Sequence, residues 1–477
     1  MSQTFLDRTL DNLRSAWREL RDSTVARGLG FDENENRKER WRNQIEACLA
    51  RRGGAVSARA RAATLGHDFL RLDEAGKKEF LHLLAAEFDV DRDRVANVMA
   101  DWMAADDVAE RALLEAELRT TLTPPFRSLL KEFNSLPQGV KFLVDLRGDL
   151  LRWRKEAPGL GILERDLKTL LTGWFDIGFL ELSRITWNSP AALLEKLIAY
   201  EAVHAIKSWD DLKGRLASDR RCFAFFHPGM PDEPLIFVEV ALVNGIAGSV
   251  DDLINRGEDA ADPGHADTAI FYSISNAQSG LAGISFGDFL IKRVVAELQR
   301  DLPNLKQFST LSPIPGFRSW MQKQIDARNR GEVTGLPVVA GAGMGALRVT
   351  GSLPAHIEAA ITDCEDLFEP QPSAERPDEV SPETREALEL LCCWYLVNAR
   401  RPDSGTAFDP VGHFHLTNGA RIERLNWHGN GNETGWQQSF GMMVNYLYDL
   451  VHIEKNHESY VGQGQVAASG AIKRLAR

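Results

Sequence analysis

Residues 271–317 limit the choice of fold more than any other part of the sequence. A strand-like apolar run leads into a turn with several glycines, an amphipathic helix follows, and a second strand ends at a Ser-Pro-Ile-Pro-Gly corner. Gln278, Gly280, Gly283 and Gly287 lie where the first strand gives way to the helix. Small residues there let backbone N–H groups approach an anion at the positive end of a helix. The pattern suggests a pyrophosphate ligand, although dinucleotide sites and simple tight connections use the same arrangement.

The chain up to about residue 188 has the apolar spacing of helices. Apolar residues recur at intervals of three and four from Leu6 to Leu20, and similar stripes follow at residues 95–102 and 114–122. This spacing places the apolar side chains on one face of each helix, so we expect these faces to form a core. We therefore predict an all-α N-terminal helical bundle over residues 1–188.

After residue 188 the pattern changes to short runs rich in Val, Ile and Phe, which are typical of strands. The runs cover residues 222–226, 235–242, 269–275 and 307–311. The first two are joined by a short segment that contains three prolines and a glycine. This connection predicts a hairpin of two adjacent antiparallel strands.

A helix with one apolar stripe separates the last two of these strands. Its buried face is expected to carry Ile291, Val294, Val295 and Leu298, and it should end before Pro303. Strands on both sides of a helix predict an α/β domain over residues 189–477, with a variable insertion at about residues 327–384. The expected fold class is therefore α+β with two domains.

The composition is that of an ordinary globular protein, with 44% hydrophobic and 26% charged residues. The formal net charge of −12 argues against nucleic acid or an anionic membrane as the main partner, because both require a cationic surface. The sequence shows no apolar run long enough to span a bilayer. Its five cysteines lack CxxC spacing, which is typical of a reducing compartment. With no signal peptide or peroxisomal address recognised, we expect a cytoplasmic location.

Ser312 is the first candidate for chemistry. It closes the second strand of residues 271–317, and the φ angles fixed by Pro313 and Pro315 stiffen the turn around it. A hydroxyl held in this way can be aimed at a ligand. The alternative is a serine that only caps its own turn.

Two histidines follow in residues 411–427, which alternate in the manner of a strand around an Asn418-Gly419 turn. On a strand, His413 and His415 would share one face. Such a pair could bind a metal ion, but no third ligand with a typical spacing is evident. An imidazole is also a natural proton donor to a carbanion or enolate near neutral pH. The spacing alone does not decide which histidine would act.

Seven stretches of the sequence, in order between residues 139 and 450, together resemble the malonyl-CoA decarboxylase family. They read GVKFLVDLRGDLL, GFLELSRITWNSP, IFYSIS, FGDFLIKRVVAELQRDLPNL, FSTLSPIPGF, FHLTNGA and VNYLYDL. The resemblance implies a helical N-terminal domain linked to oligomerisation and a catalytic domain of the GNAT acetyltransferase fold. The sequence departs from the family between about residues 330 and 380.

The resemblance also implies roles for individual residues. The loop at about residues 281–288 would bind the pyrophosphate of coenzyme A, Ser312 would hold the malonyl carboxylate, and His415 rather than His413 would protonate the product. The predicted substrate-binding residues are Gln278, Gly280, Leu281, Ala282, Gly283, Ile284, Ser285, Phe286, Gly287, Asp288, Ser312 and His415. Asn445 and Tyr446 are possible auxiliary residues, although Tyr446 and Tyr448 also fit core aromatics with a hydrated hydroxyl.

The expected reaction converts malonyl-CoA to acetyl-CoA and CO2. Loss of CO2 leaves an electron pair on C2, and the adjacent thioester carbonyl accepts it as an enolate. Because the thioester is the electron sink, we expect no metal ion and no cofactor, with coenzyme A as part of the substrate. The expected partners are malonyl-CoA and further copies of the chain through the helical domain. The alternatives are a GNAT-type acyltransferase with an acyl-CoA donor and a non-catalytic acyl-CoA sensor.

Overall fold

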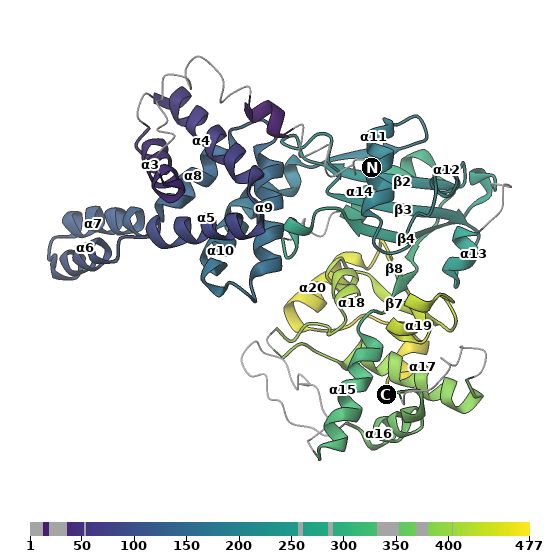
Figure 1. The fold of residues 1–477 in the computed structure, drawn as a ribbon. Helices are drawn as coiled ribbons and strands as arrows, with labels where there is room; N and C mark the ends of the chain where they lie inside the picture. The colour runs from purple at the N-terminus through teal and green to yellow at the C-terminus, as the bar shows by residue number, and fades with distance from the viewer. Residues whose placement is uncertain are drawn as a thin grey trace. The chain divides into compact units, whose positions relative to one another are not determined.

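The structure is a computed structural model that describes residues 13–18, 36–51, 54–255, 261–284, 290–331, 353–368, 380–402 and 404–477. The chain forms two compact units, whose helices and strands are labelled in Figure 1. The helical unit comprises Met1–Glu181, Phe226–Leu235 and Asn276–Ser285. The α/β unit comprises Leu182–Phe225, Ile236–Ser275 and Phe286–Arg477. Two short segments from the sequence that we assigned to the second domain thus cluster with the helical unit.

The helical unit confirms the predicted all-α character of the N-terminal region. Its α-helices are α3 (Arg37–Leu49), α4 (Gly54–Arg71), α5 (Glu74–Glu87), α6 (Arg92–Ala104), α7 (Val108–Thr121), α8 (Pro125–Asn134), α9 (Gly139–Trp153) and α10 (Gly161–Trp174). Aromatic rings form the centre of its core. The ring of Phe142 lies 4.8 Å from that of Trp17 and 5.2 Å from that of Phe133, centroid to centroid. Edge-to-face contacts of this kind stabilise a core beyond the area that they bury.

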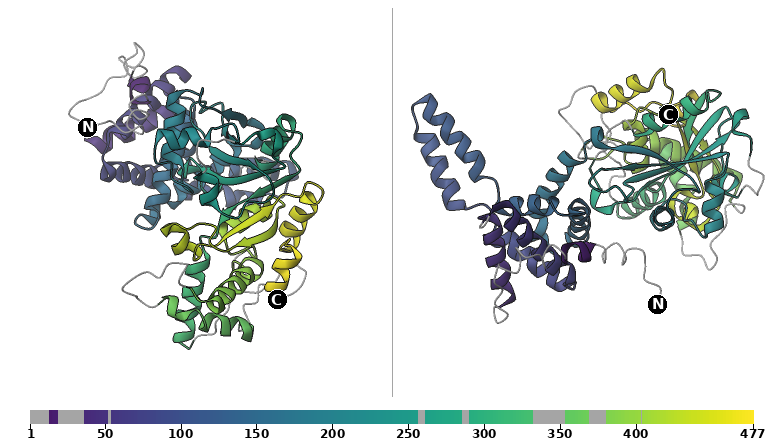
Figure 2. Two further views of the ribbon diagram at one scale, coloured as in Figure 1. Left: turned by 90° about the vertical axis from the view of Figure 1, so that its right-hand side faces the viewer. Right: turned by 90° about the horizontal axis from the view of Figure 1, so that it is seen from above.

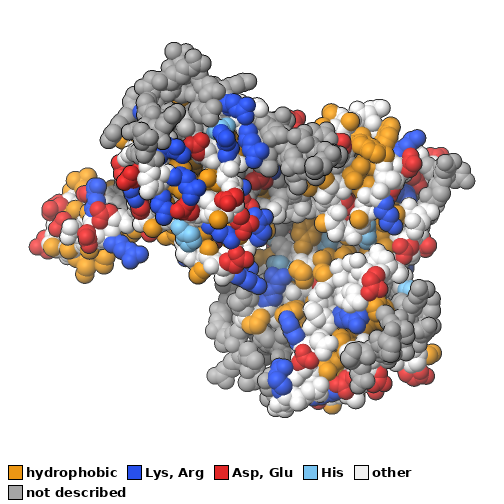
Figure 3. Space-filling view, viewed as in Figure 1, with side chains coloured by type: hydrophobic (Ala, Val, Ile, Leu, Met, Phe, Trp, Pro, Cys, Tyr) orange, Lys and Arg blue, Asp and Glu red, His pale blue; other side chains and the backbone are white. Residues whose placement is uncertain are grey.

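Helices α6 and α7 differ from the rest of the helical unit. They form a hairpin that projects from the other helices of the unit (Figure 2). Val98 is the buried residue of α6, and α7 has none. Apolar side chains gather on the surface of this hairpin (Figure 3), and the exposed ones are Met99, Met103, Val108, Leu113 and Leu122. Apart from Val98, the apolar stripes at residues 95–102 and 114–122 therefore contribute no buried side chain, contrary to our expectation.

The α/β unit is built around a mixed sheet in the order β1-β2-β3-β4-β5-β8-β6, with β7 also paired to β8. The strands are β1 (Glu181–Ile185), β2 (Arg220–Phe226), β3 (Ile236–Val243), β4 (Thr268–Asn276), β5 (Gln307–Thr310), β6 (Ser312–Pro313), β7 (Arg421–Asn426) and β8 (Met443–Leu447). Strands β2 and β3 form the predicted antiparallel hairpin, and β4 pairs with β5 in parallel. All residues of β2 and β3 are buried.

Helices cover this sheet and extend the unit beyond it (Figure 1). They are α11 (Ala191–Tyr200), α12 (Trp209–Arg215), α13 (Val250–Ile254), α14 (Leu290–Asp301), α15 (Phe317–Asn329), α16 (Ala355–Thr362), α17 (Pro382–Asn398), α18 (Pro410–Thr417), α19 (Glu433–Ser439), α20 (Ile453–Gln463) and α21 (Gly470–Leu475). Helix α14 buries Ile291, Val294, Val295 and Leu298, as its stripe predicts. Helix α16 lies within the predicted insertion at about residues 327–384, much of which falls outside the described residues.

Strand β8 joins the parts of the sheet that carry the candidate site. It pairs antiparallel with β5, β6 and β7. Ser312 of β6 lies opposite Val444, and Ser309 of β5 lies opposite Leu447. Residues on β8 are therefore close to the Ser-Pro-Ile-Pro-Gly corner that follows β5. Within the described part of the chain, no helix combines the length and apolar character needed to cross a membrane.

Candidate active site

Ser312 and His415 meet inside the α/β unit, although they are far apart in the sequence. The Ser312 hydroxyl oxygen lies 3.1 Å from Nε2 of His415, and it also donates to Oγ1 of Thr310 at 2.8 Å. The two side chains are almost fully enclosed, with 5% and 2% exposure. The structure thus brings together the two residues on which the predicted chemistry depends.

His415 lies on helix α18, so the strand predicted for the first arm of residues 411–427 is wrong, whereas the second arm forms the predicted strand as β7. Asp409 caps the helix, because its carboxylate accepts hydrogen bonds from the N–H groups of Val411 and Gly412 at 3.0 and 2.8 Å. Pro410 occupies the first turn, where its missing N–H is harmless. Asp409-Pro410 is a typical start of a helix and was the sequence signal for α18. The strand-like alternation of the residues that follow made this signal easy to miss.

The helix separates the two histidines that a strand would have placed on one face. Residues two apart on a helix point about 200° from each other. Nδ1 of His413 lies 2.8 Å from the Tyr460 hydroxyl, whereas His415 faces Ser312. The geometry therefore removes the basis for a metal site that uses both histidines.

Tyr448 contacts the candidate pair, although the sequence analysis did not select it as a site residue. Its hydroxyl lies 2.7 Å from Nδ1 of His415, so the imidazole is held at both nitrogens. Tyr446 precedes it by two residues on β8, and its ring stacks on the imidazole at 4.6 Å between centroids. Tyr448 directly follows the last residue of β8, and the Tyr-x-Tyr alternation of an extended segment was the signal that both rings share one face.

The environment of His415 determines its protonation. Burial lowers the pKa of His415 to about 3, so the imidazole is neutral near pH 7. Since the Ser312 hydroxyl donates to Thr310, the hydrogen-bond network assigns the proton to Nε2, which then donates to Ser312. Nδ1 accepts from the Tyr448 hydroxyl in this arrangement. A neutral imidazole with its N–H directed at the serine is the resulting ground state.

Asn445 and Tyr446, the two auxiliary candidates, have different surroundings. Nδ2 of Asn445 donates to the carbonyl oxygens of Thr310 and Ala247, and Oδ1 accepts from Asn426. The Asn445 amide is thus fully used in joining β8 to its neighbours. The Tyr446 hydroxyl is buried and has no hydrogen-bond partner among the residues described. Burial also raises the pKa of Tyr446, so the hydroxyl keeps its proton.

Asp409 links the helix that carries His415 to the corner that carries Ser312. Besides capping α18, its carboxylate accepts from the N–H of Gly316 at 3.4 Å and from the Tyr395 hydroxyl at 3.3 Å. Burial raises the pKa of Asp409, while the backbone N–H bonds oppose this shift. One carboxylate therefore fixes both elements of the pair.

The glycine loop belongs to the helical unit, and packing and backbone conformation explain why Gly280 and Gly283 are glycines. A Cβ on Gly280 would lie 1.8 Å from the Val144 carbonyl oxygen of α9, so a side chain does not fit there. Ala282 and Gly283 form a type II turn, with φ of +70° at Gly283 and a bond from the Ile284 N–H to the Leu281 carbonyl.

The other predicted loop residues either support the chain or cannot be placed. The Gln278 side chain donates to the Pro234 carbonyl, and Leu281 and Ile284 are buried. Ser285, Phe286, Gly287 and Asp288 lie outside the described residues. Binding of a phosphate by this loop stays a prediction.

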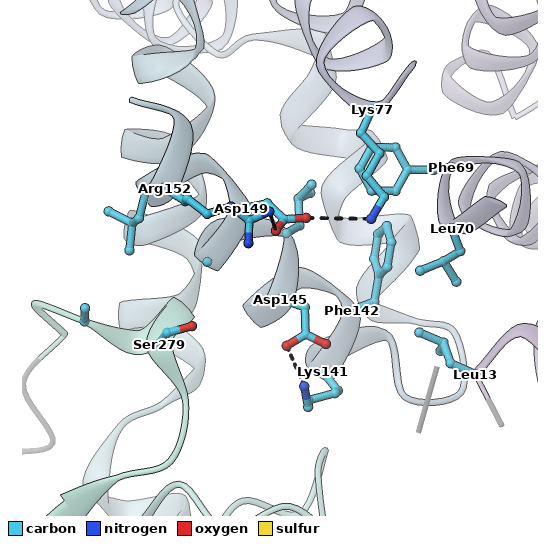
Figure 4. A pocket seen from close by; sticks show the side chains of 14 residues that line it. Leu13, Phe69, Leu70, Lys77, Lys141, Phe142, Asp145, Asp149, Arg152 and Ser279 are labelled. Carbon is cyan, nitrogen blue, oxygen red and sulfur yellow. Dashed lines mark hydrogen bonds and ion pairs between the residues drawn. The ribbon is translucent and has the colours of Figure 1, made fainter. Parts of the chain in front are cut away.

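A cavity of about 690 Å³ lies beside the same loop in the helical unit (Figure 4). Ser279 and Ala282 contribute to its wall, together with charged side chains of α5 and α9. These charges are paired: Lys141 contacts Asp145, and Lys77 and Arg152 contact Asp149. Burial raises the pKa of both aspartates. The cavity wall is thus mainly apolar, with a few charged groups whose cations are largely compensated by these carboxylates.

Comparison with known proteins identifies the family. Residues 88–175 match the malonyl-CoA decarboxylase N-terminal domain, and residues 178–477 match the malonyl-CoA decarboxylase C-terminal domain. Mitochondrial malonyl-CoA decarboxylase of Anser anser anser is 38% identical over 412 residues, which are 84% of this chain and 80% of that protein. The enzyme of Mus musculus is 37% identical over 417 residues, which are 85% and 82% of the two chains.

Solved structures give the same result for the fold. Malonyl-CoA decarboxylase from Rhodopseudomonas palustris superposes with a TM-score of 0.81 at 38% identity, covering 92% of this chain and 100% of that one. The enzyme from Agrobacterium vitis gives a TM-score of 0.78 at 38% identity, with 92% and 99% covered. The chain belongs to the malonyl-CoA decarboxylase family, whose members are carboxy-lyases.

Proposed function

We propose that this protein converts malonyl-CoA to acetyl-CoA and CO2, with Ser312 and His415 as the reacting side chains. The observation that carries the proposal is the 3.1 Å contact between the Ser312 hydroxyl and Nε2 of His415 inside the α/β unit. Family membership indicates the substrate and the reaction. The contact places a proton donor, His415, beside a side chain that can bind the malonyl carboxylate, Ser312.

Ser312 would hold the malonyl carboxylate. Its hydroxyl now donates to Thr310, and rotation about the Cβ–Oγ bond can redirect that proton to a carboxylate oxygen. A carboxylate held perpendicular to the thioester plane loses CO2 most readily, because the breaking C–C bond then overlaps the carbonyl π system. The electron pair moves to C2 and onto the thioester oxygen. Positioning of this kind lowers the entropic part of the barrier.

His415 would deliver the proton to C2 after CO2 leaves. In the free protein the imidazole is neutral, but a carboxylate bound next to Nε2 favours the imidazolium and raises the pKa of His415. Substrate binding would then take up one proton, which is the proton consumed when malonyl-CoA becomes acetyl-CoA and CO2. After protonation of C2 the imidazole returns to its neutral form. The Tyr448 hydroxyl at Nδ1 fixes the ring throughout.

Of the two auxiliary candidates, Tyr446 has surroundings that suit a role in the reaction better than those of Asn445. Its hydroxyl is buried, keeps its proton, and has no acceptor among the described residues. Gly412 leaves room beside it, since a Cβ there would lie 3.0 Å from that hydroxyl oxygen. A donor stacked against His415 in this way suits the developing enolate oxygen, where one such donor contributes about 3 kcal/mol.

The loop at residues 281–288 binds the coenzyme A pyrophosphate, and neither a metal ion nor another cofactor takes part, because the thioester accepts the electrons. We also place the protein in the cytoplasm, which suits its five cysteines, all of them free thiols. The two relatives described above carry the word mitochondrial in their names, so a fractionation experiment is the direct test.

Self-association through the helical domain is the proposed partner interaction, and the α6–α7 hairpin is its surface. The exposed Val108 and Leu113 have 83% and 73% of their surface in solvent. Apolar side chains of this exposure on a projecting hairpin are typical of an interface. Val108→Glu with Leu113→Glu should lower the mass measured by light scattering, whereas Lys131→Glu on α8 should not. An unchanged mass would place the interface elsewhere.

One experiment tests the reaction itself. Purified protein is incubated with malonyl-CoA, with and without an amine acceptor, and CO2 and acetyl-CoA are measured. We expect equal amounts of both products regardless of the amine. Transfer of the acyl group to the amine would instead support an acyltransferase. Coenzyme A binding without any turnover would support a sensor.

A further inference from the structure

We propose that Lys168 of α10 binds a phosphate group of the coenzyme A part of the substrate, beside Gly283. This inference rests on the proposed function and extends it to a residue outside the glycine loop. Apart from Gly283 and its two chain neighbours, the only described heavy atom within 4 Å of a Cβ built on Gly283 is Nζ of Lys168, at 3.7 Å. Within the described part of the chain, an ammonium group therefore borders otherwise open space at the turn.

The charge of Lys168 is uncompensated within the described part of the chain. No carboxylate there lies within ion-pair distance of its Nζ. The carboxylate one helical turn earlier, Glu164, is engaged by Arg147, with 3.0 Å to Nε and 2.9 Å to Nη2. Asp166 lies 3.9 Å from Arg127. The acidic neighbours of Lys168 on α10 thus have other partners, and its positive charge is available to an anion.

The position of Lys168 relative to the loop is fixed by buried contacts. Nη1 of Arg147 donates to the Gly280 carbonyl at 2.6 Å, and the same guanidinium pairs with Glu164. Helix α10 is thereby tied to the loop one turn before Lys168. Gly283 is exposed, and its N–H donates to no acceptor among the described residues. A free N–H next to an ammonium group is a suitable pair of donors for a phosphate oxygen.

The other cations near the loop are less suitable. Lys77, Lys141 and Arg152 line the cavity beside Ser279 and Ala282, but each contacts an aspartate. A phosphate that approached them would have to compete with these carboxylates. Among the described residues Lys168 faces the same loop without such a competitor, which is why the structure assigns the phosphate contact to it.

Lys168→Gln tests the assignment, with Lys131→Gln on α8 as the matched control. For Lys168→Gln we expect the affinity for free coenzyme A, measured by calorimetry, to fall about 10-fold, as loss of one charge-assisted hydrogen bond predicts. KM for malonyl-CoA should rise similarly with kcat little changed. Turnover of malonyl-pantetheine, which lacks the nucleotide phosphates, should be unaffected. Lys168→Arg should restore most of the coenzyme A affinity.

Three outcomes would overturn the inference. They are unchanged coenzyme A affinity in Lys168→Gln, an equal loss with malonyl-pantetheine, and an equal loss in Lys131→Gln. Circular dichroism and the melting temperature identify a variant that fails to fold, and Lys168→Arg then provides the comparison. If the wild-type protein releases no CO2 from either substrate, the proposed function fails. The calorimetric result for coenzyme A still decides the role of Lys168.

Discussion

Ser312 and His415 are enclosed by the α/β unit, whereas Gly283 lies at an exposed turn of the helical unit beside the half-buried Lys168 of α10. In the enclosed pair, the Ser312 hydroxyl and both ring nitrogens of His415 have hydrogen-bond partners, and the imidazole is neutral because it is buried. Near the turn, the Lys168 ammonium group and the Gly283 N–H have no partner among the residues that the structure describes. The first arrangement is suited to acting on a transition state, and the second to binding a charged ligand. Substitutions should therefore affect kcat in one region and KM in the other.

The largest effect is expected for Ser312→Ala and His415→Ala. Each removes one partner of the reacting pair, so kcat should fall by about 10²- to 10⁴-fold, with little change in the binding of a non-reactive malonyl-CoA analogue. The double variant should be little worse than either single one, because both act on one transition state. Steady-state kinetics measure both quantities.

His413→Ala is the control for the catalytic pair. His413 contacts Tyr460 rather than Ser312, so this variant should keep most of its activity. Near-normal turnover by folded His415→Ala would remove the assigned acid and direct attention to Tyr446.

Tyr448→Phe should have a smaller effect. It removes the hydroxyl at Nδ1 of His415 but keeps the ring, so the imidazole loses its orientation and its fixed tautomer. We expect kcat to fall about 10-fold and KM to change little, as loss of one hydrogen bond predicts. Tyr460→Phe, which removes the hydroxyl at His413, is the matched control. Equal losses in the two variants would indicate a general structural effect.

Stability should depend on pH through His415. Its pKa in the folded protein is about 3, below the value near 6.5 in the unfolded chain, so the unfolded state binds more protons between these values. The stabilisation is present above about pH 6.5 and is lost as pH falls towards 3. Between pH 7 and pH 5 the loss should be about 2 kcal/mol.

Denaturant unfolding at pH 7 and pH 5 measures this contribution. In His415→Gln the change in unfolding free energy between the two pH values should be smaller than in the wild type by that amount. An identical pH dependence in both proteins would mean that the imidazole is not held neutral.

The smallest effect is expected from a chelator. The thioester accepts the electrons of the broken C–C bond, so EDTA should leave activity unchanged and added metal ions should not increase it. Activity assays before and after dialysis against EDTA provide the measurement. Inhibition that zinc reverses would show that the enclosed pair needs a metal ion after all.

The sequence predicted those features that depend on neighbouring residues. The β2–β3 hairpin and the buried stripe of α14 follow from local alternation and spacing, and the structure confirms both. The helix around His415 was missed, because residues 411–416 alternate as a strand does, while the cap at Asp409 lies just before them. The partnership of Tyr448 with His415 also depends on tertiary pairing.

The glycine loop shows a different limit of sequence analysis. Glycine at position 280 was interpreted as space for a phosphate, yet the space is required by Val144, which lies more than a hundred residues earlier. A contact of that sequence separation leaves no local pattern. The same holds for Lys168, which reaches the loop from α10 and carries no motif of its own.

The position of β8 has a consequence for the order in which the protein becomes active during synthesis. Ser312 and His415 are 103 residues apart, and Ser312 pairs with Val444 of β8, which is made later than both. Contacts over such separations form late in folding, because a long loop must first be closed. A nascent chain that ends before Met443 would contain both side chains without the strand that brings them into register. Decarboxylation should thus begin only after β8 has left the ribosome.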